Sequence, residues 1–519
     1  MGHYELLAEL EEPMMINRWL KQAPWLLLLT ALCCAVSQPM RAQSANAPVY
    51  VTLWFDTEDY ILPQSDDAAK RLAEILTDLG VRATFKVVGE KARVLQQRGR
   101  TDVITALQKH DIGYHSDWHS RQPTVSVYLQ DSGWDDGVAE FLRREESGAV
   151  DVKRIFGVTP VCYGQPGGAW APQAYPALRK MGIRMYLDEA DHVGLDGQPF
   201  YYGGILNVFN LGSAVTRMEL NGPDNLPRAR EQFQKVCDML RAKGGGTISI
   251  YYHPCEFVHA QFWDGVNFSH GSNPPRSEWK LPPTKPQAQI EKGFSDFEQY
   301  IRFVRDQKGV RFVTATELKK LYVDEAAEHR FTKADLVALG HGVRSGITFQ
   351  RTGDTTVSAA DLLSLLNQQA AAFVKGGALL ETVTIEPLDG PGRTFSAVGR
   401  GAPPATVPWS AFKETVVDVA GYCRNRSEVP SEVWIGAYSI PPETYLATLA
   451  GVFVEIAQKG RAPAEVNIIS GSLTAGKYVA KDSPRLWGWV IFPEGFHSPE
   501  IMELGRLQAW TLKPAILRR

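Results

Sequence analysis

The chain has 519 residues, of which 44% are hydrophobic and 22% are charged, and its formal net charge is −3 at pH 7. This composition is typical of a soluble globular protein, and the small net charge without basic clusters argues against a nucleic-acid partner. Because the length exceeds what one compact core usually holds, we expect two domains after the N-terminal leader.

The first segment has the order of a secretory signal peptide. Arg18 and Lys21 precede an apolar run at residues 23–36, and small residues follow it. Since that run is too short to span a bilayer comfortably, we expect cleavage around residues 42–45 and no stable membrane insertion afterwards. We therefore predict a signal peptide over residues 1–45 and a secreted or periplasmic protein; an uncleaved N-terminal anchor is the alternative.

From residue 49 short β-rich runs alternate with helical patterns, beginning with "VYVTLWF", "DDAAKRLAEILTDLG", "ATFKVVG" and "TDVITALQKH". About seven such units fill roughly 280 residues, which favours an α/β fold with a (β/α) barrel, complete or incomplete, over an open sheet. We predict this barrel over residues 48–328. In such a barrel the functional residues collect at the C-terminal ends of the strands.

After residue 330 the pattern changes to longer helices and isolated strands that repeat. "VPSEVWI" at 429–435 and "APAEVNI" at 462–468 lie 33 residues apart, and "LLETVTI" at 379–385 is a looser copy. Repetition of helix, turn and strand indicates a C-terminal α/β domain over residues 331–519 whose repeats bind a wall polymer or another glycan. An ordinary α/β domain with coincidental similarity is the alternative.

Four cysteines remain after removal of the leader: Cys162, Cys237, Cys255 and Cys423. Their spacing contains no C-x-x-C metal pattern. Cys162 and Cys255 each lie beside one of the motifs below, so they form either a disulfide or two buried thiols, and the sequence leaves both open.

The strand "LWFDTEDY" runs directly into three acids, Asp56, Glu58 and Asp59. Carboxylates packed against an apolar strand repel one another unless a cation or a proton lies between them. A turn with a helix cap is the simpler interpretation of the same residues.

Two histidines, His115 and His119, follow the next but one strand in "IGYHSDWHS". Residues four apart reach the same face if the chain turns helically after the strand. One carboxylate and two imidazoles form a catalytic metal site with positions open for water and substrate. The acids and the histidines together therefore predict a divalent metal site at neighbouring strand ends.

Two further strand ends carry unusual residues. In "YGQPGGAWAP", residues 163–172, Gly167 lets the backbone approach a ligand and Trp170 is a candidate pocket wall, although a tight turn needs neither role. "ISIYYHPCEF" ends a buried strand on His253, with Pro254 blocking further pairing. His253 is thus either a core residue or a proton donor at the barrel mouth.

A long loop at residues 262–286 follows the His253 strand and is rich in aromatic residues, Gly and Pro. Loops of this length are uncommon without a role. Trp263, Phe268 and Trp279 are candidates to stack on sugar rings or to form a lid, and a loop that only packs over the barrel end is the alternative.

In their order along residues 48–325 these four motifs resemble the polysaccharide deacetylases of the NodB-homology group, carbohydrate esterase family four. The resemblance implies a deformed (β/α) barrel, a divalent metal that is usually zinc, and hydrolysis of an N- or O-acetyl group on a sugar. It assigns Asp56 as the general base, His115 and His119 as metal ligands, and His253 as the acid that protonates the leaving group.

The chain departs from this family pattern in two places. "DTED" separates its acids, so the metal carboxylate is Glu58 or Asp59, and we favour Glu58 because residues two apart face the same way on a strand. Gly164 stands two residues before Pro166, where the family usually has an arginine that orients the base. Arg276 is a candidate replacement; a different substrate or weak catalysis are the alternatives.

The segment after residue 400 resembles the pseudomurein-binding repeat, which would imply attachment to a cell-wall polymer. Taken together, the sequence predicts a secreted metal-dependent hydrolase that removes acetyl groups from a carbohydrate or cell-wall glycan. Its predicted substrate contacts are Gly167, Trp170, Trp263 and Trp279. A non-catalytic glycan-binding protein on the same fold and a hydrolase of a non-sugar amide are the two alternatives.

Overall fold

The computed structural model describes residues 47–518 except 344–345, 354, 398 and 400–402. The predicted signal peptide at residues 1–45 lies outside the described residues, so cleavage and export stay predictions. Among the helices that the structure describes, none is long and apolar enough to cross a membrane.

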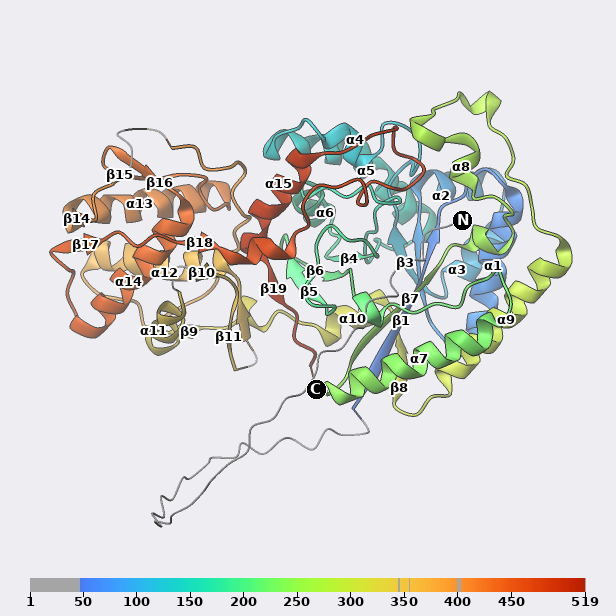
Figure 1. The fold of residues 1–519 in the computed structure, drawn as a ribbon, viewed down its shortest axis with the longest axis horizontal. Coiled ribbons are helices and arrows are strands. Elements are labelled where there is room, and N and C mark those ends of the chain that lie inside the picture. The colour runs from blue at the N-terminus through green and yellow to red at the C-terminus, as the bar shows by residue number, and fades with distance from the viewer. Residues whose placement is uncertain (1–46, 344–345, 354, 398, 400–402, 519) are drawn as a thin grey trace, which may run out of the picture. The chain divides into compact units, whose positions relative to one another are not determined.

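A parallel sheet forms the centre of the first part of the chain (Figure 1). Its strands are β1 (Val49–Thr57), β2 (Thr84–Val87), β3 (Asp111–Tyr114), β7 (Gly246–Tyr252) and β8 (Val310–Val313). The order is β3-β2-β1-β7, and β8 pairs with the first half of β1. Every residue of β1 except Tyr50 is buried, as expected for a parallel strand covered on both faces.

The sheet continues beyond β3 through single-residue bridges at Tyr163. The next strands are β4 (Met185–Leu187), β6 (Ile205–Val208), β5 (Phe200–Tyr202) and β19 (Lys513–Pro514). β4 and β6 pair in parallel, whereas β5 pairs antiparallel with both β6 and β19. The prediction of an α/β fold with a parallel sheet is therefore confirmed. No ladder among the described residues joins β6 to β7, so barrel closure stays a prediction.

Helices lie between successive strands and cover the sheet (Figure 1). They are α1 (Pro63–Asp78), α2 (Gly89–Gln97), α3 (Thr101–Leu107), α4 (Val125–Leu129), α5 (Trp134–Phe156), α6 (Ala174–Lys180), α7 (Asn225–Ala242), α8 (Trp263–Asn267), α9 (Gln287–Arg305) and α10 (Ala315–Leu321). The longest, α5, has two acids in its first turn, two basic residues in its last, and Gly157 at φ 75° after its end. This charge order complements the helix dipole, and the left-handed glycine ends the helix.

A second core is built from three helices of 18 residues each, α12 (Ala359–Gly376), α13 (Trp409–Arg426) and α14 (Pro442–Lys459). Each helix is followed by a residue in the left-handed conformation, namely Gly377, Ser427 or Gly460. A short strand comes next each time: β13 (Thr382–Val383), β15 (Val433–Ile435) or β17 (Glu465–Asn467). The three sequence copies thus share one local form, whereas their likeness to pseudomurein-binding repeats stays a prediction.

Short elements complete this region. They are β9 (Phe331–Thr332), α11 (Lys333–Gly342), β10 (Gly346–Ile347), β11 (Gln350–Thr352), β12 (Thr355–Val357), β14 (Thr406–Pro408), β16 (Tyr438–Ile440) and β18 (Ser472–Leu473).

The last segment of the chain returns to the first core. Trp487, Ile491 and Met502 are buried there, the last of these in α15 (Pro499–Gln508), and β19 extends the sheet beside β5. Figure 1 shows this segment in red, in the same region of the view as helices α4 to α6. Residues far beyond the predicted limit at residue 328 therefore help to build the first domain.

Candidate metal and catalytic site

The strand register brings Asp56, Lys86 and His253 close together at one edge of the sheet. Asp56 is the ladder partner of Lys86 on β2, and Lys86 in turn is the partner of Gly113 on β3. His253 directly follows Tyr252, which pairs with Phe55. The carboxyl ends of parallel strands meet at one edge of a sheet, so these side chains gather at one place.

Glu58, His115 and His119 form a buried cluster whose ligand atoms all lie within 4.8 Å of one another. Glu58 Oε2 lies 3.2 Å from His115 Nε2 and 2.8 Å from His119 Nε2. The histidines do not meet through a helical turn. Instead Ser116 and His119 adopt left-handed backbone angles, φ 63° and 55°, and this loop brings both imidazoles to the carboxylate.

Hydrogen bonds orient both rings for ligation. His115 Nδ1 donates to the carbonyl of Gly164 at 3.0 Å, and His119 Nδ1 lies 2.6 Å from Ser120 Oγ. Each Nε2 atom therefore faces Glu58. A carboxylate and two imidazole nitrogens aimed at one point fit a divalent cation such as zinc, which uses these ligands with oriented second nitrogens.

The charge state of the cluster is consistent with this fit. Burial opposes ionisation of Glu58, but His119, His253 and His115 hold its pKa well below the ordinary value. Trp263 adds to this, since its Nε1 donates to Glu58 Oε1 at 2.7 Å. The carboxylate is therefore an anion already held in place.

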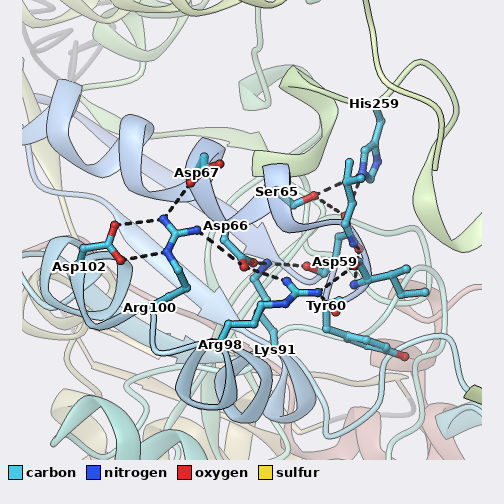
Figure 2. A network of polar contacts seen from close by, with 12 residues as sticks. Asp59, Tyr60, Ser65, Asp66, Asp67, Lys91, Arg98, Arg100, Asp102 and His259 are labelled. Carbon is cyan, nitrogen blue, oxygen red and sulfur yellow. Dashed lines mark hydrogen bonds and ion pairs between the residues drawn. The ribbon is translucent and has the colours of Figure 1, made fainter. Parts of the chain in front are cut away.

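Asp59, the other candidate carboxylate, is hydrogen-bonded in the turn into α1, where Figure 2 shows it with Ser65 and His259. Its Oδ1 accepts hydrogen bonds from the backbone N–H groups of Ile61 at 2.8 Å and Leu62 at 3.2 Å. Its Oδ2 lies 2.9 Å from His259 Nε2 and accepts from Ser65. The structure thus brings Glu58 to the histidines and gives Asp59 the helix-turn role.

A buried lysine supplies the cation beside Asp56. Lys86 has no exposed surface; its Nζ lies 2.8 Å from Asp56 Oδ1 and 3.0 Å from Asp188 Oδ2. Burial opposes the ammonium form, but Asp188 and Asp56 raise the pKa of Lys86 above its ordinary value. A Cβ atom at Gly164 would lie 2.1 Å from Lys86 Nζ, so the missing side chain at residue 164 is what leaves room for this lysine.

Arg276 was a candidate to replace the family arginine, and that expectation is wrong. Its Nη1 donates to Glu90 Oε1 at 2.7 Å, whereas the cation that contacts Asp56 is Lys86. The sequence signal for the true partner was a lysine inside the otherwise apolar strand "ATFKVVG".

His253 lies next to Asp56 and is held by a second carboxylate. Its Nε2 lies 3.6 Å from Asp56 Oδ2, while its Nδ1 pairs with Glu256, whose Oε2 contacts Arg217 Nη2 at 2.6 Å. Burial opposes protonation, but Glu58 and Glu256 raise the pKa of His253 to about 9. The imidazolium form is therefore present at neutral pH, as a general acid requires.

The predicted substrate contacts lie in different surroundings. Trp263 is fully buried and holds Glu58, while Trp279 is half-buried against Tyr60 and Phe268. Both belong to a small core beneath the long loop. The loop therefore packs over the strand ends, which is one of the two interpretations that the sequence left open.

Trp170 and Gly167 contact the C-terminal segment. Trp170 has no exposed surface, stacks on His192 at 5.3 Å between ring centroids, and donates from Nε1 to Tyr175. It therefore lies in the core instead of forming a pocket wall. A Cβ atom at Gly167 would lie 2.5 Å from Trp489 Cδ1, so the close approach is that of Trp489.

The four described cysteines are free. Cys162 lies against Gly113 and Cys255 belongs to the small core under the loop. Of the two possibilities left open by the sequence, the structure shows buried thiols at these two positions.

A separate cavity of about 290 Å³ reaches His119 from the side of residues 116–125.

No protein-family model matches this chain, and no curated protein matches it. Among solved structures, a Mycobacterium smegmatis protein described as a polysaccharide deacetylase is 17% identical, with 53% of this chain and 90% of that chain covered at a TM-score of 0.34. A mutant of the peptidoglycan deacetylase PdaC from Bacillus subtilis is 15% identical, covering 53% and 91% at a TM-score of 0.28. An allantoinase is 11% identical, covering 53% and 90% at a TM-score of 0.36.

Proposed function

We propose that this protein is an exported, metal-dependent hydrolase that removes acetyl groups from a carbohydrate or cell-wall glycan. The observation that carries the proposal is the meeting of a three-ligand cluster, a lysine-paired aspartate and a carboxylate-held histidine at adjacent strand ends. The leader pattern over residues 1–45 supports export.

Glu58, His115 and His119 would hold a divalent metal, zinc being the ion that best suits these ligands. A metal in such a site lowers the pKa of water and polarises an acyl carbonyl. Asp56 acts as the general base, because the Lys86 ammonium contacts its carboxylate at 2.8 Å and fixes it beside the cluster. These are the requirements for attack of water on an amide or ester.

His253 acts as the general acid on the departing amine or alcohol. Glu256 accepts a hydrogen bond from Nδ1–H of His253, which leaves Nε2–H directed toward Asp56 and the reacting group. The fixed ring orientation follows the same logic as a catalytic histidine held by a carboxylate. The carboxylate of the base and the imidazole of the acid thus lie 3.6 Å apart.

The test is acetate release from acetylated glycans and chito-oligosaccharides by the zinc-loaded mature protein. Asp56→Asn and His115→Ala should each abolish release, because one removes the base and the other a metal ligand. Two variants serve as matched controls, Asp238→Asn on an exposed helix face and His329→Ala, whose side chain is half-exposed. Both controls should match the wild type.

Absence of release from every glycan by an otherwise folded, zinc-binding protein would refute the deacetylase proposal. The same protein should then be assayed on non-sugar amides, since the base, the acid and the metal cluster suit any acyl group of that kind. Binding of a glycan with no turnover at all would instead identify a non-catalytic binder.

A further inference from the structure

Residues 486–493, here called the C-terminal strap, cross the loops that carry the candidate site. Gln122 Nε2 donates to the carbonyl of Ile491 at 2.6 Å, and the backbone N–H of His270 donates to the carbonyl of Val490 at 2.8 Å. The strap is therefore bonded both to the loop that follows the metal histidines and to the long loop that follows His253. Figure 1 shows this red segment close to α8.

Two glycines of the third motif make room for the strap. A Cβ atom would lie 2.5 Å from Trp489 Cδ1 at Gly167 and 2.6 Å from the carbonyl oxygen of Leu486 at Gly168. Gly167 also has φ 54°, a conformation that other residues rarely adopt. The "PGG" turn is thus shaped to receive the strap, which the chain supplies from more than 300 residues further on.

Trp489 is the residue that the strap presents. Its indole N–H donates to Asp264 Oδ2 at 2.8 Å, and Asp264 is fully buried, yet 41% of the tryptophan is exposed. The ring of Phe262 meets it at 5.6 Å and an interplanar angle of 85°, and Phe262 in turn lies 5.2 Å from the His253 ring. These rings form one aromatic wall that leads away from the candidate acid.

The anchored end of Trp489 is also connected to the metal cluster. Ser120 Oγ lies 3.5 Å from Asp264 Oδ2 and 2.6 Å from His119 Nδ1. The indole N–H therefore shares the Asp264 carboxylate with Ser120, whose hydroxyl contacts His119. A tryptophan whose polar edge is fixed and whose face is free loses little conformational entropy when a flat apolar surface stacks on it.

We propose that Trp489 is a specificity-determining residue, whose ring stacks on a sugar unit next to the unit that reacts beside His253. The inference rests on the proposed function and narrows it, since it makes the substrate an oligosaccharide or polymer that extends along the strap. Stacking on a neighbouring unit improves kcat/KM only for substrates long enough to reach it.

The experiment compares kcat/KM for acetate release from an acetylated monosaccharide and from a series of longer oligosaccharides. Trp489→Ala should lower the value for the long substrates roughly fivefold to tenfold more than for the monosaccharide. Trp489→Phe, which keeps a ring but loses the N–H donor, should retain most of this length dependence. Val150→Ala removes an exposed apolar side chain, 56% of which is accessible, from α5 and should match the wild type.

Equal losses on short and long substrates, or none, would overturn the proposal. Calorimetric binding of an unreactive long oligosaccharide, with thermal unfolding of each variant alongside, keeps the inference separate from turnover. If the wild type releases no acetate, the proposed function fails. Weaker oligosaccharide binding by Trp489→Ala alone would still support the stacking role, and unchanged binding would refute it.

Discussion

Replacing Lys86 by methionine tests the electrostatic centre of the site. Methionine keeps most of the side-chain volume, so the main loss is the charge between Asp56 at 2.8 Å and Asp188 at 3.0 Å. Removing one partner of a buried ion pair typically costs about 3–5 kcal/mol, because the remaining carboxylates stay buried without a cation. Lys86 has no exposed surface, so water cannot replace it.

We therefore expect Lys86→Met to lower the free energy of unfolding by about 4 kcal/mol and kcat by about a hundredfold, since Asp56 loses the cation that contacts its carboxylate and holds it in position. Lys513→Met is the matched control. Lys513 is also buried and contacts two carboxylates, Asp324 and Asp361, at 2.8 Å each, in a different part of the fold. It should cost similar stability and leave kcat unchanged.

Urea unfolding gives the stability of both variants, and acetate release at saturating substrate gives kcat. A loss below about 1 kcal/mol for Lys86→Met would refute the reasoning on burial. Equal loss of kcat in the Lys513 control would show that lowered stability, and not the position of Asp56, accounts for the activity.

Three further predictions follow from the same contacts. Burial raises the pKa of Glu145 from 4.5 to about 7, so the folded protein binds one more proton than the unfolded chain between these pH values. The free energy of unfolding should therefore fall by about 3 kcal/mol as the pH rises from 4.5 to about 7. Urea unfolding of Glu145→Gln should show no such dependence on pH. Glu256 helps to raise the pKa of His253 to about 9. Glu256→Gln should therefore move the alkaline limb of the pH profile of kcat to lower pH and lower kcat about tenfold. An unchanged profile would show that Glu256 does not control the protonation of His253. His115→Ala should weaken zinc binding at least about tenfold by calorimetry, whereas His110→Ala, which alters a buried histidine bonded to Ala73, should not.

The strand-end motifs were sufficient to name the residues that meet at the site, because their positions follow from local patterns. An acid or a histidine directly after an apolar strand must lie at the carboxyl edge of a parallel sheet, and this holds for Asp56 and His253. The α/β class follows from the same alternation of strands and helices. The choice between Glu58 and Asp59 needed the structure, because both follow the strand and only their hydrogen bonds distinguish them.

Sequence patterns are weaker predictors where contacts depend on strand register or on distant segments. Lys86 meets Asp56 only because β1 and β2 pair in one particular register. Trp489 reaches the site from the far end of the chain, and the predicted wall residue Trp170 is instead buried where that segment packs. Residue type and spacing could not show the positions of Trp489 and Trp170, because both depend on how the C-terminal segment packs on the first core.

Charge balance links the lysine, the cluster and the proposed metal. Asp56, Glu58 and Asp188 are buried at neighbouring strand ends, and Lys86 is the cation that contacts two of them. Lys86 cannot also neutralise Glu58, which instead faces the two imidazoles. Those rings must then either take up protons or share a metal ion with the carboxylate, because buried charges are stable only when paired. A divalent ion would leave both histidines neutral and Asp56 free to accept a proton. The lysine permitted by Gly164 thus leaves Asp56 available for the proposed base role, while the three-ligand cluster would hold the metal.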